Sequence, residues 1–134
     1  MSQENVEVVQ RVIAAVNERD VDRYLSCCTD DIQVRTPWAE VGGVYEGPDG
    51  IRRYFADLGD TSPDFHLTIE RLEPVGLDRV LGLLRLTASG RASGIAAASE
   101  TPTALIYDLV DGKIRRIRIF LDRDEALEAA GLSE

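Results

Sequence analysis

The sequence predicts an α+β fold in which helices come first along the chain and a run of antiparallel strands follows. Apolar residues recur every three or four positions in the first part of the chain and at every second position in the later part. Helices that precede such a run of strands typically cover one face of the sheet. The 134 residues contain no internal repeat and no linker-like segment, so we expect a single domain over residues 1–134.

Three helices are predicted ahead of the main run of strands. The first has one apolar face, the second is short, and the third begins where Pro48 supplies a backbone angle suited to a first helical turn. Gly59 and the segment 61–63 end the third helix. The residues predicted to be buried on these helices are Val6, Val9, Ile13 and Val16, then Val21, Tyr24, Leu25 and Cys28, and then Ile51, Tyr54, Phe55 and Leu58.

Strands are predicted where polar and apolar residues alternate. The first covers residues 32–36 and precedes the third helix, and the others cover residues 65–72, 80–89, 101–110 and 114–121. The sequence Asp111-Gly112 is typical of the tight turn that joins the last two strands. Asp122 and Glu125 then form the pattern of a helix-capping box, which predicts a short C-terminal helix over residues 126–130 that ends at Gly131.

Composition excludes several classes of protein. The formal net charge of −9 repels a nucleic-acid backbone or an anionic membrane surface, so we expect neither as a partner. No apolar run approaches the ~20 residues that cross a bilayer, and the polar N-terminus is unlike a signal peptide, which together predict a cytoplasmic protein. Cys27, Cys28 and the single His66 are too few ligands for a zinc site. The sequence therefore predicts buried free cysteines, no metal and no cofactor.

Three stretches carry a resemblance to a known family. They are VVQRVIAAVNERDVDRYLSCCTDDIQVRTPW, GVYEGPDGIRRYFADL and LVDGKIRRIRIFLDRDEALEAAGL. They resemble the SnoaL-like branch of the nuclear transport factor 2-like superfamily, which includes ketosteroid isomerases, polyketide cyclases and limonene epoxide hydrolase. The resemblance extends from Asn5 to Leu132. It implies a cone-shaped fold, in which a strongly curved, mostly antiparallel sheet wraps around three helices and an apolar cavity.

The same resemblance implies a homodimer that packs through the outer faces of the two sheets. The alternation of the last strands predicts that Ile106 and Phe120 are exposed on that outer face. The basic run Lys113, Arg115, Arg116 and Arg118 suggests phosphate binding as one alternative. Arg116 and Arg118 alternate with Ile117 and Ile119, however, so we expect them on the outer face, solvated or paired with acidic residues across a dimer.

The groups that ketosteroid isomerases use are absent from the positions where the resemblance would place them. Those enzymes need a tyrosine and a protonated aspartic acid as hydrogen-bond donors, and an aspartate as general base. The matching positions here hold Val12, Leu105 and Thr36. Valine and leucine transfer no proton, and threonine is not a base near neutral pH. The sequence therefore predicts no isomerisation by that mechanism.

The resemblance and the phase of the strands together predict an apolar ligand pocket. Trp38 follows Thr36 in phase and is predicted to line the pocket mouth, the alternative being a plug at the end of the core. Arg85 enters the pocket if the strand face that it shares with Leu81 and Leu83 looks inward. The alternative is an arginine at the sheet rim that pairs with a carboxylate. The predicted pocket residues are Val12, Val16, Thr36, Trp38, Tyr54, Phe55, Arg85, Leu105, Tyr107 and Ile119.

Two classes of function remain open, and an apolar small molecule is the predicted partner in both. The first is a small-molecule-binding protein without a recognised catalytic set. The second is an isomerase, a polyketide cyclase or an epoxide hydrolase-like enzyme that uses an unrecognised acid or base. The acid–base inventory is poor, because Asp122 is predicted to cap a helix and His66 is predicted to face outward.

Overall fold

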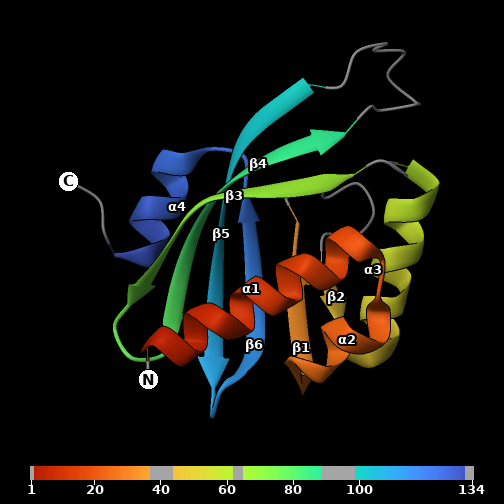
Figure 1. Cartoon of the computed structure of the whole chain (residues 1–134), viewed down its shortest axis with the longest axis horizontal. Coiled ribbons are helices and arrows are strands. Elements are labelled where there is room, and N and C mark those ends of the chain that lie inside the picture. Colours follow the sequence, from red (N-terminus) through yellow and green to blue (C-terminus); the bar gives the residue numbers. More distant parts are fainter. Residues whose placement is uncertain (1, 37–43, 62–64, 89–98, 132–134) are drawn as a thin grey trace.

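The structure is a computed structural model that describes residues 2–36, 44–61, 65–88 and 99–131. The predicted order of helices first and strands later is confirmed, with one additional short strand, β2 (Figure 1). The elements are α1 (Ser2–Glu18), α2 (Val21–Ser26), β1 (Cys28–Arg35), β2 (Val44–Glu46), α3 (Gly47–Thr61), β3 (His66–Val75), β4 (Arg79–Ala88), β5 (Ser99–Val110), β6 (Lys113–Phe120) and α4 (Arg123–Ala130).

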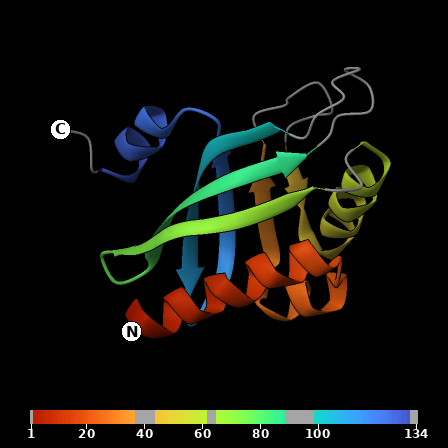
Figure 2. The ribbon, with the colours of Figure 1, turned by 45° about the horizontal axis from the view of Figure 1, so that its top comes forward.

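The described strands form one six-stranded sheet in the order β2-β1-β6-β5-β4-β3. Neighbouring strands are antiparallel except for β1 and β6, which are parallel. The sheet is curved, and α1 crosses its inner face with α2 and α3 beside it (Figure 1). Helix α4 lies apart from these three helices, against the outer face (Figure 2). The predicted α+β fold with a curved, mostly antiparallel sheet is therefore confirmed.

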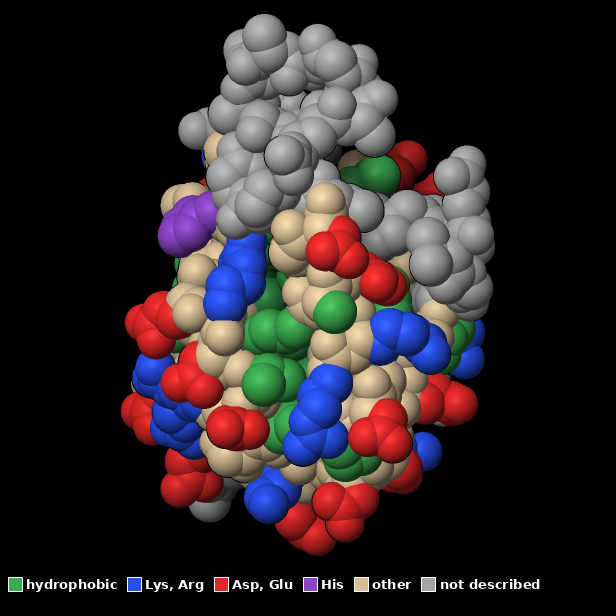
Figure 3. All heavy atoms as spheres, turned by 90° about the vertical axis from the view of Figure 1, so that its right-hand side faces the viewer, with side chains coloured by type: hydrophobic (Ala, Val, Ile, Leu, Met, Phe, Trp, Pro, Cys, Tyr) green, Lys and Arg blue, Asp and Glu red, His purple; other side chains and the backbone are tan. Residues whose placement is uncertain are grey.

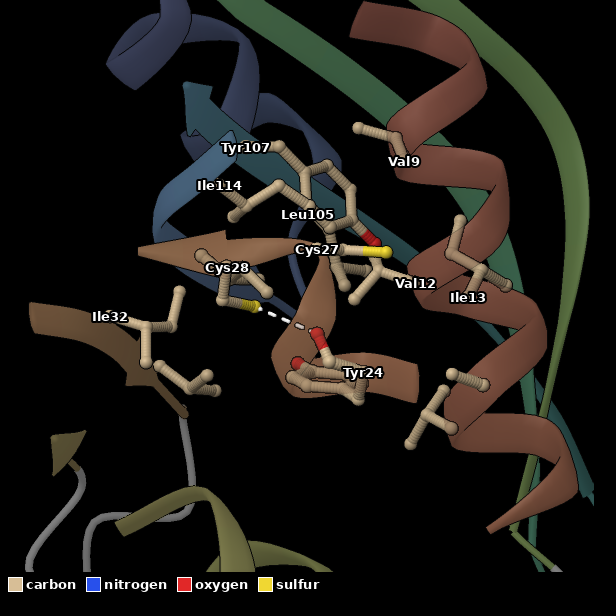
Figure 4. Packing of buried hydrophobic residues seen from close by; sticks show 14 of the residues in the cluster. Val9, Val12, Ile13, Tyr24, Cys27, Cys28, Ile32, Leu105, Tyr107 and Ile114 are labelled. Atoms are coloured by element: carbon tan, nitrogen blue, oxygen red, sulfur yellow. Dashed lines mark hydrogen bonds between the residues drawn. The ribbon is translucent and has the colours of Figure 1, made fainter. Parts of the chain in front are cut away.

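The main core lies between α1 and the inner face of the sheet. Leu105 and Tyr107 of β5 are 3% and 1% exposed, and Val12 of α1 is 1% exposed. Figure 4 shows these three side chains gathered between the helix and the strand. Full burial of an aliphatic or aromatic side chain stabilises a fold by roughly 1.5–3 kcal/mol, so this layer holds α1 on the sheet.

The two cysteines belong to the same core, as predicted. Both are free thiols and both are buried. The thiol of Cys28 donates a hydrogen bond of 3.2 Å to the backbone carbonyl of Tyr24 (Figure 4). This contact joins the start of β1 to α2.

Strand β4 has the opposite phase from the one needed to bring Arg85 inward. Its register pairs Val80 with Tyr107, whose side chain faces α1, so Val80 faces inward and Leu81 faces outward. Arg85 lies an even number of positions from Leu81 and shares the outer face. The strand face that holds Leu81 and Arg85 therefore does not look inward, and the inclusion of Arg85 among the predicted pocket residues is wrong. Alternation could not assign the face, because apolar residues occupy both sides of this strand.

Helix α4 covers part of the outer face, and this corrects a second prediction. Ile106 is 0% exposed, since it packs in a cluster with Ala126 and Ala130 of the helix. Phe120 is partly buried against the same cluster. The prediction that both side chains are exposed on the outer face is therefore wrong.

The predicted cap of the C-terminal helix is confirmed. The side chain of Asp122 accepts hydrogen bonds from the backbone N–H groups of Asp124 and Glu125, at 2.9 and 3.4 Å. Gly131 ends the helix in the left-handed conformation, with φ of 82°. Within the described residues, none of the helices has both the length and the apolar character that crossing a membrane requires.

Candidate functional site

A small cavity lies between the inner face of the sheet and the helices. Its walls come from all three inner helices and from β3, β5 and β6, and its volume is about 10 Å³. That volume is the room needed for roughly one water molecule. The lining residues are Val12, Ile13, Val16, Tyr24, Tyr54, Leu67, Leu105, Tyr107, Ile117 and Ile119.

Most of the predicted pocket residues meet at this cavity. Six of them line it, namely Val12, Val16, Tyr54, Leu105, Tyr107 and Ile119. Tyr24, Leu67 and Ile117 were not among the predicted pocket residues, although Tyr24 was assigned to the buried face of the second helix. Ile13 was likewise assigned only to the buried face of the first helix.

Two predicted pocket residues have other surroundings. Phe55 packs edge-on against Tyr24, with ring centroids 5.1 Å apart, and it does not line the cavity. Arg85 lies on the outer face and pairs with Glu70, which also accepts a 2.8 Å hydrogen bond from Arg123. The alternative prediction, an arginine paired with a carboxylate at the sheet rim, therefore describes Arg85. Trp38 lies outside the described residues.

Thr36 follows β1 and is buried, with 9% of its surface exposed. It has the inward phase of Val34, and the parallel register of β1 with β6 places it next to Ile119 in the same inward row. Its hydroxyl oxygen is buried and has no hydrogen-bond partner among the described residues. Thr36 thus brings an unsatisfied polar group to the row of residues that walls the cavity.

Three tyrosines supply the polar groups of the cavity itself. Tyr24, Tyr54 and Tyr107 come from α2, α3 and β5 and are each at most 4% exposed. No hydrogen bond joins any of their hydroxyl groups to another described residue. Their oxygen atoms are not among the fully buried side-chain atoms that lack a partner, so they border the space of the cavity and offer it unused hydrogen-bonding capacity.

The tyrosine hydroxyls stay protonated over the whole physiological range. Burial raises the pKa of Tyr107 well above its usual value, and the neighbouring phenol of Tyr54 raises it further. Burial likewise raises the pKa of Tyr54, with a smaller contribution from Tyr45. The pKa of Tyr24 is raised by burial first and by Tyr54 second. These groups therefore act as neutral donors and acceptors of hydrogen bonds.

The cavity wall offers no group suited to proton transfer near neutral pH. Its described lining contains no Asp, Glu, His or Lys side chain, and phenols with raised pKa values are poor acids and poor general bases. Val12 and Leu105, which stand where isomerases carry hydrogen-bond donors, are apolar parts of this wall. The arrangement combines an apolar wall with neutral phenol hydroxyl groups, around a space for about one water molecule.

The wider surface gives no sign of a highly charged ligand on the helical side. Figure 3 shows acidic and basic side chains interspersed on the face beside α3, with hydrophobic side chains near its middle. Among the described parts of the chain, no three His, Cys, Asp or Glu side chains come together in a metal-binding arrangement.

Comparison with known proteins agrees with this architecture. The chain is 27% identical over 119 residues to calcium/calmodulin-dependent protein kinase type II subunit delta from Oryctolagus cuniculus, a match that covers 86% of this chain and 22% of that protein. The chain thus spans about a fifth of the length of that relative.

Solved structures share the fold. A putative SnoaL-like polyketide cyclase from Jannaschia sp. CCS1 superposes with a TM-score of 0.74 at 20% identity, over 99% of this chain and 94% of that one. TerC, co-crystallised with polyporic acid, superposes with a TM-score of 0.76 at 20% identity, over 96% and 98% of the two chains. Other matching structures are described as having a ketosteroid isomerase-like or NTF2-like fold. Residues 9–117 match the SnoaL-like domain, and the chain therefore belongs to the SnoaL-like domain family.

Proposed function

We propose that this protein binds an apolar small molecule in the cavity between α1, α2, α3 and the sheet. The observation that carries the proposal is the set of three buried tyrosine hydroxyls without protein partners, in an otherwise apolar wall. A ligand with one carbonyl or hydroxyl oxygen would bond at least one of them while its hydrocarbon part fills apolar space. TerC, which shares the fold, was co-crystallised with polyporic acid, and this supports a small-molecule ligand.

The proposed ligand is neutral. The described lining contains no cationic side chain, and a buried carboxylate or phosphate without a cation loses its hydration at a high cost. The cavity has room for about one water molecule, so a larger ligand requires side chains of the wall to change rotamer. Phe55 is only partly buried beside Tyr24, and we propose it as the aromatic neighbour that moves.

Small-molecule binding is better supported than catalysis as the function of this cavity. An isomerase, a polyketide cyclase or an epoxide hydrolase-like enzyme needs a group that moves a proton, and the described lining offers only phenols whose pKa values are raised by burial. We therefore place small-molecule binding first.

A homodimer formed through the outer sheet faces stays a prediction. The predicted exposure of Ile106 on the outer face supported it, but α4 buries that side chain. The prediction now rests on family resemblance and on the part of the outer face that α4 leaves uncovered.

Three bicyclic probes of similar size test the proposed ligand class. They are 1-tetralone with one carbonyl, naphthalene with no oxygen, and 1-naphthoate with a negative charge. We expect 1-tetralone to bind most tightly, because a neutral hydrogen bond adds roughly 0.5–1.5 kcal/mol, or about 2–12-fold in affinity. Titration calorimetry with the whole protein measures the order, and tighter binding of 1-naphthoate than of 1-tetralone would contradict the proposal.

Matched tyrosine variants locate the site. Tyr54→Phe and Tyr107→Phe remove one cavity hydroxyl each and keep the ring, so we expect weaker binding of 1-tetralone and unchanged binding of naphthalene. Tyr45→Phe is the control, because the Tyr45 hydroxyl donates a 2.7 Å hydrogen bond to Asp57 and does not line the cavity. If all three variants bound 1-tetralone equally well, the tyrosines would not be the ligand contacts.

A further inference from the structure

The outer face of the sheet carries a group of arginines that the proposed cavity does not explain. Strands β1 and β6 lie side by side (Figure 1), and their register pairs Gln33 with Arg116 and Arg35 with Arg118. All four side chains have the phase opposite to the buried residues Val34 and Ile117, so they project from the outer face. We call the three basic residues, Arg35, Arg116 and Arg118, the arginine patch.

Neighbouring strands are about 4.8 Å apart, and alternate residues on one strand are about 6.6 Å apart. The arginine patch and Gln33 therefore occupy the corners of a small rectangle on two adjacent strands. Arg118 and Arg35 are direct cross-strand neighbours. Like charges in that position repel one another, so this arrangement is unfavourable unless a negative charge lies nearby.

One carboxylate serves several of these guanidinium groups. Asp108 of β5 lies 2.9 Å from Arg116, 3.5 Å from Arg118 and 2.7 Å from Arg79. Arg35 has no hydrogen bond or ion pair with a described residue. Three guanidinium groups thus share a single carboxylate, and Arg35 lies beside them without an acidic partner among the described residues, within a chain whose formal net charge is −9.

A second acid at the edge of the patch, Glu46, is already engaged. Glu46 of β2 accepts a 2.8 Å hydrogen bond from the side-chain amide of Gln33. Contacts between paired residues on neighbouring strands continue from Glu46 on β2 through Gln33, Arg116 and Asp108 to Arg79 on β4. They fix the positions of Gln33 and Arg116. It leaves Arg35 and Arg118 as the members of the patch with the weakest acidic contacts.

Arg118 lies where guanidinium groups outnumber carboxylates. Its side chain is only 20% exposed, and its Nε atom is buried without a hydrogen-bond partner among the residues that the structure describes. Burial lowers the pKa of Arg118, and the nearby guanidinium groups of Arg116, Arg79 and Arg35 lower it further, against the opposing effect of Asp108. A partly buried cation with these surroundings is stabilised by an additional anion.

We propose that the arginine patch is a binding site for a small oxyanion, a phosphate or carboxylate group, on the outer face of the sheet. Guanidinium groups bind such groups through paired N–H donors. Arg35 supplies a charge without a carboxylate partner among the described residues, and Arg118 has only its 3.5 Å contact with Asp108. Arg116 and Gln33 complete the rectangle, and Asp108 holds Arg116 in place. The site lies on the opposite side of the sheet from the tyrosine-lined cavity.

Thermal unfolding of the whole protein in different salts at equal ionic strength provides the test. The probes are inorganic phosphate, citrate and chloride, which separate a phosphate site, a carboxylate site and general screening. At an anion concentration ten times its dissociation constant we expect the melting temperature to rise by about 4 °C for phosphate or citrate. Chloride at equal ionic strength is expected to have less effect. Equal shifts in all three salts would overturn the proposal.

Charge-removing variants locate the effect. We expect Arg35→Gln to weaken the titrated affinity for the stabilising anion about tenfold, because hydrogen bonds to charged groups contribute roughly 1.5–3 kcal/mol. Arg118→Gln is the second variant, with the same expected loss. Arg52→Gln is the control, because Arg52 on α3 is exposed and pairs only with Asp49 at 3.4 Å among the described residues.

The binding of 1-tetralone and the oligomeric state of the same variants distinguish this site from the cavity and from a subunit contact. Binding of 1-tetralone is expected to be unchanged in Arg35→Gln. If the control variant lost anion binding as much as Arg35→Gln and Arg118→Gln, the effect would be one of net charge, and the proposal would be wrong. It would be equally wrong if the patch variants altered only the oligomeric state, since these arginines would then belong to a contact between subunits.

Discussion

Truncation of Ile106 tests whether α4 forms part of the folded core or only lies against the surface. In the structure Ile106 is 0% exposed, and it packs with Leu81 and Ala104 of the sheet and with Ala126 and Ala130 of α4. Replacing it with alanine leaves a gap that α4 cannot fill without moving. We therefore expect Ile106→Ala to destabilise the monomer itself.

The magnitude follows from the burial. Truncation of a fully buried isoleucine to alanine costs about 2–5 kcal/mol, and truncation to valine costs about 0.5–1.5 kcal/mol. The neighbours Ala126 and Ala130 are small and lie on a short helix, so some collapse is expected. We predict about 3 kcal/mol for Ile106→Ala and about 1 kcal/mol for Ile106→Val.

Urea unfolding followed by circular dichroism measures these losses, with light scattering to record the oligomeric state of each variant. Leu77→Ala is the control, because Leu77 is 85% exposed in the turn between β3 and β4, and exposed substitutions usually change stability by less than about 0.5 kcal/mol. A loss below about 1 kcal/mol for Ile106→Ala, together with loss of a dimer, would refute the packing of α4 and would restore Ile106 to a subunit interface.

Three further predictions concern charge, thiol reactivity and assembly. Burial raises the pKa of Asp108, but hydrogen bonds from Arg79 and Arg116 outweigh it and hold that pKa below its usual value. This lowered pKa stabilises the folded state at pH values above the unfolded pKa of about 3.9, and the stabilisation is lost as the pH falls through the folded value. Asp108→Asn should therefore flatten the dependence of unfolding free energy on pH below about 5. An unchanged slope would contradict this prediction. Burial, and to a lesser degree Cys27, raise the pKa of Cys28 to about 12. A thiol reagent at about pH 8 should therefore label Cys28 only after unfolding. Fast labelling of Cys28 in the native protein would contradict its burial. Light scattering should give twice the chain mass of 14.8 kDa, and a monomer at micromolar concentration would exclude the homodimer.

Local pattern was sufficient for much of the secondary structure. The apolar face of α1, the Asp122 cap and the Asp111-Gly112 turn depend on residues that are neighbours in the chain, so their chemistry is visible in the sequence. The outward position of His66 and the burial of both cysteines follow from the same local patterns. Six predicted pocket residues meet at the cavity because the family resemblance supplied the pocket, with Val12 and Leu105 in it, and the phase of the strands and helices marked other residues that face it.

Tertiary structure decided which face of each strand looks inward and what covers the other face. A period of two tells which residues share a face but not which face is buried, and β4 has apolar residues on both sides. Its phase was fixed only by pairing Val80 with Tyr107. The burial of Ile106 required α4 to pack on the outer face, and the pairing of Arg85 with Glu70 required β3 and β4 to lie side by side in the sheet. The volume of the cavity likewise depends on how side chains from several separate elements fill one space, so no local pattern in the sequence predicts it.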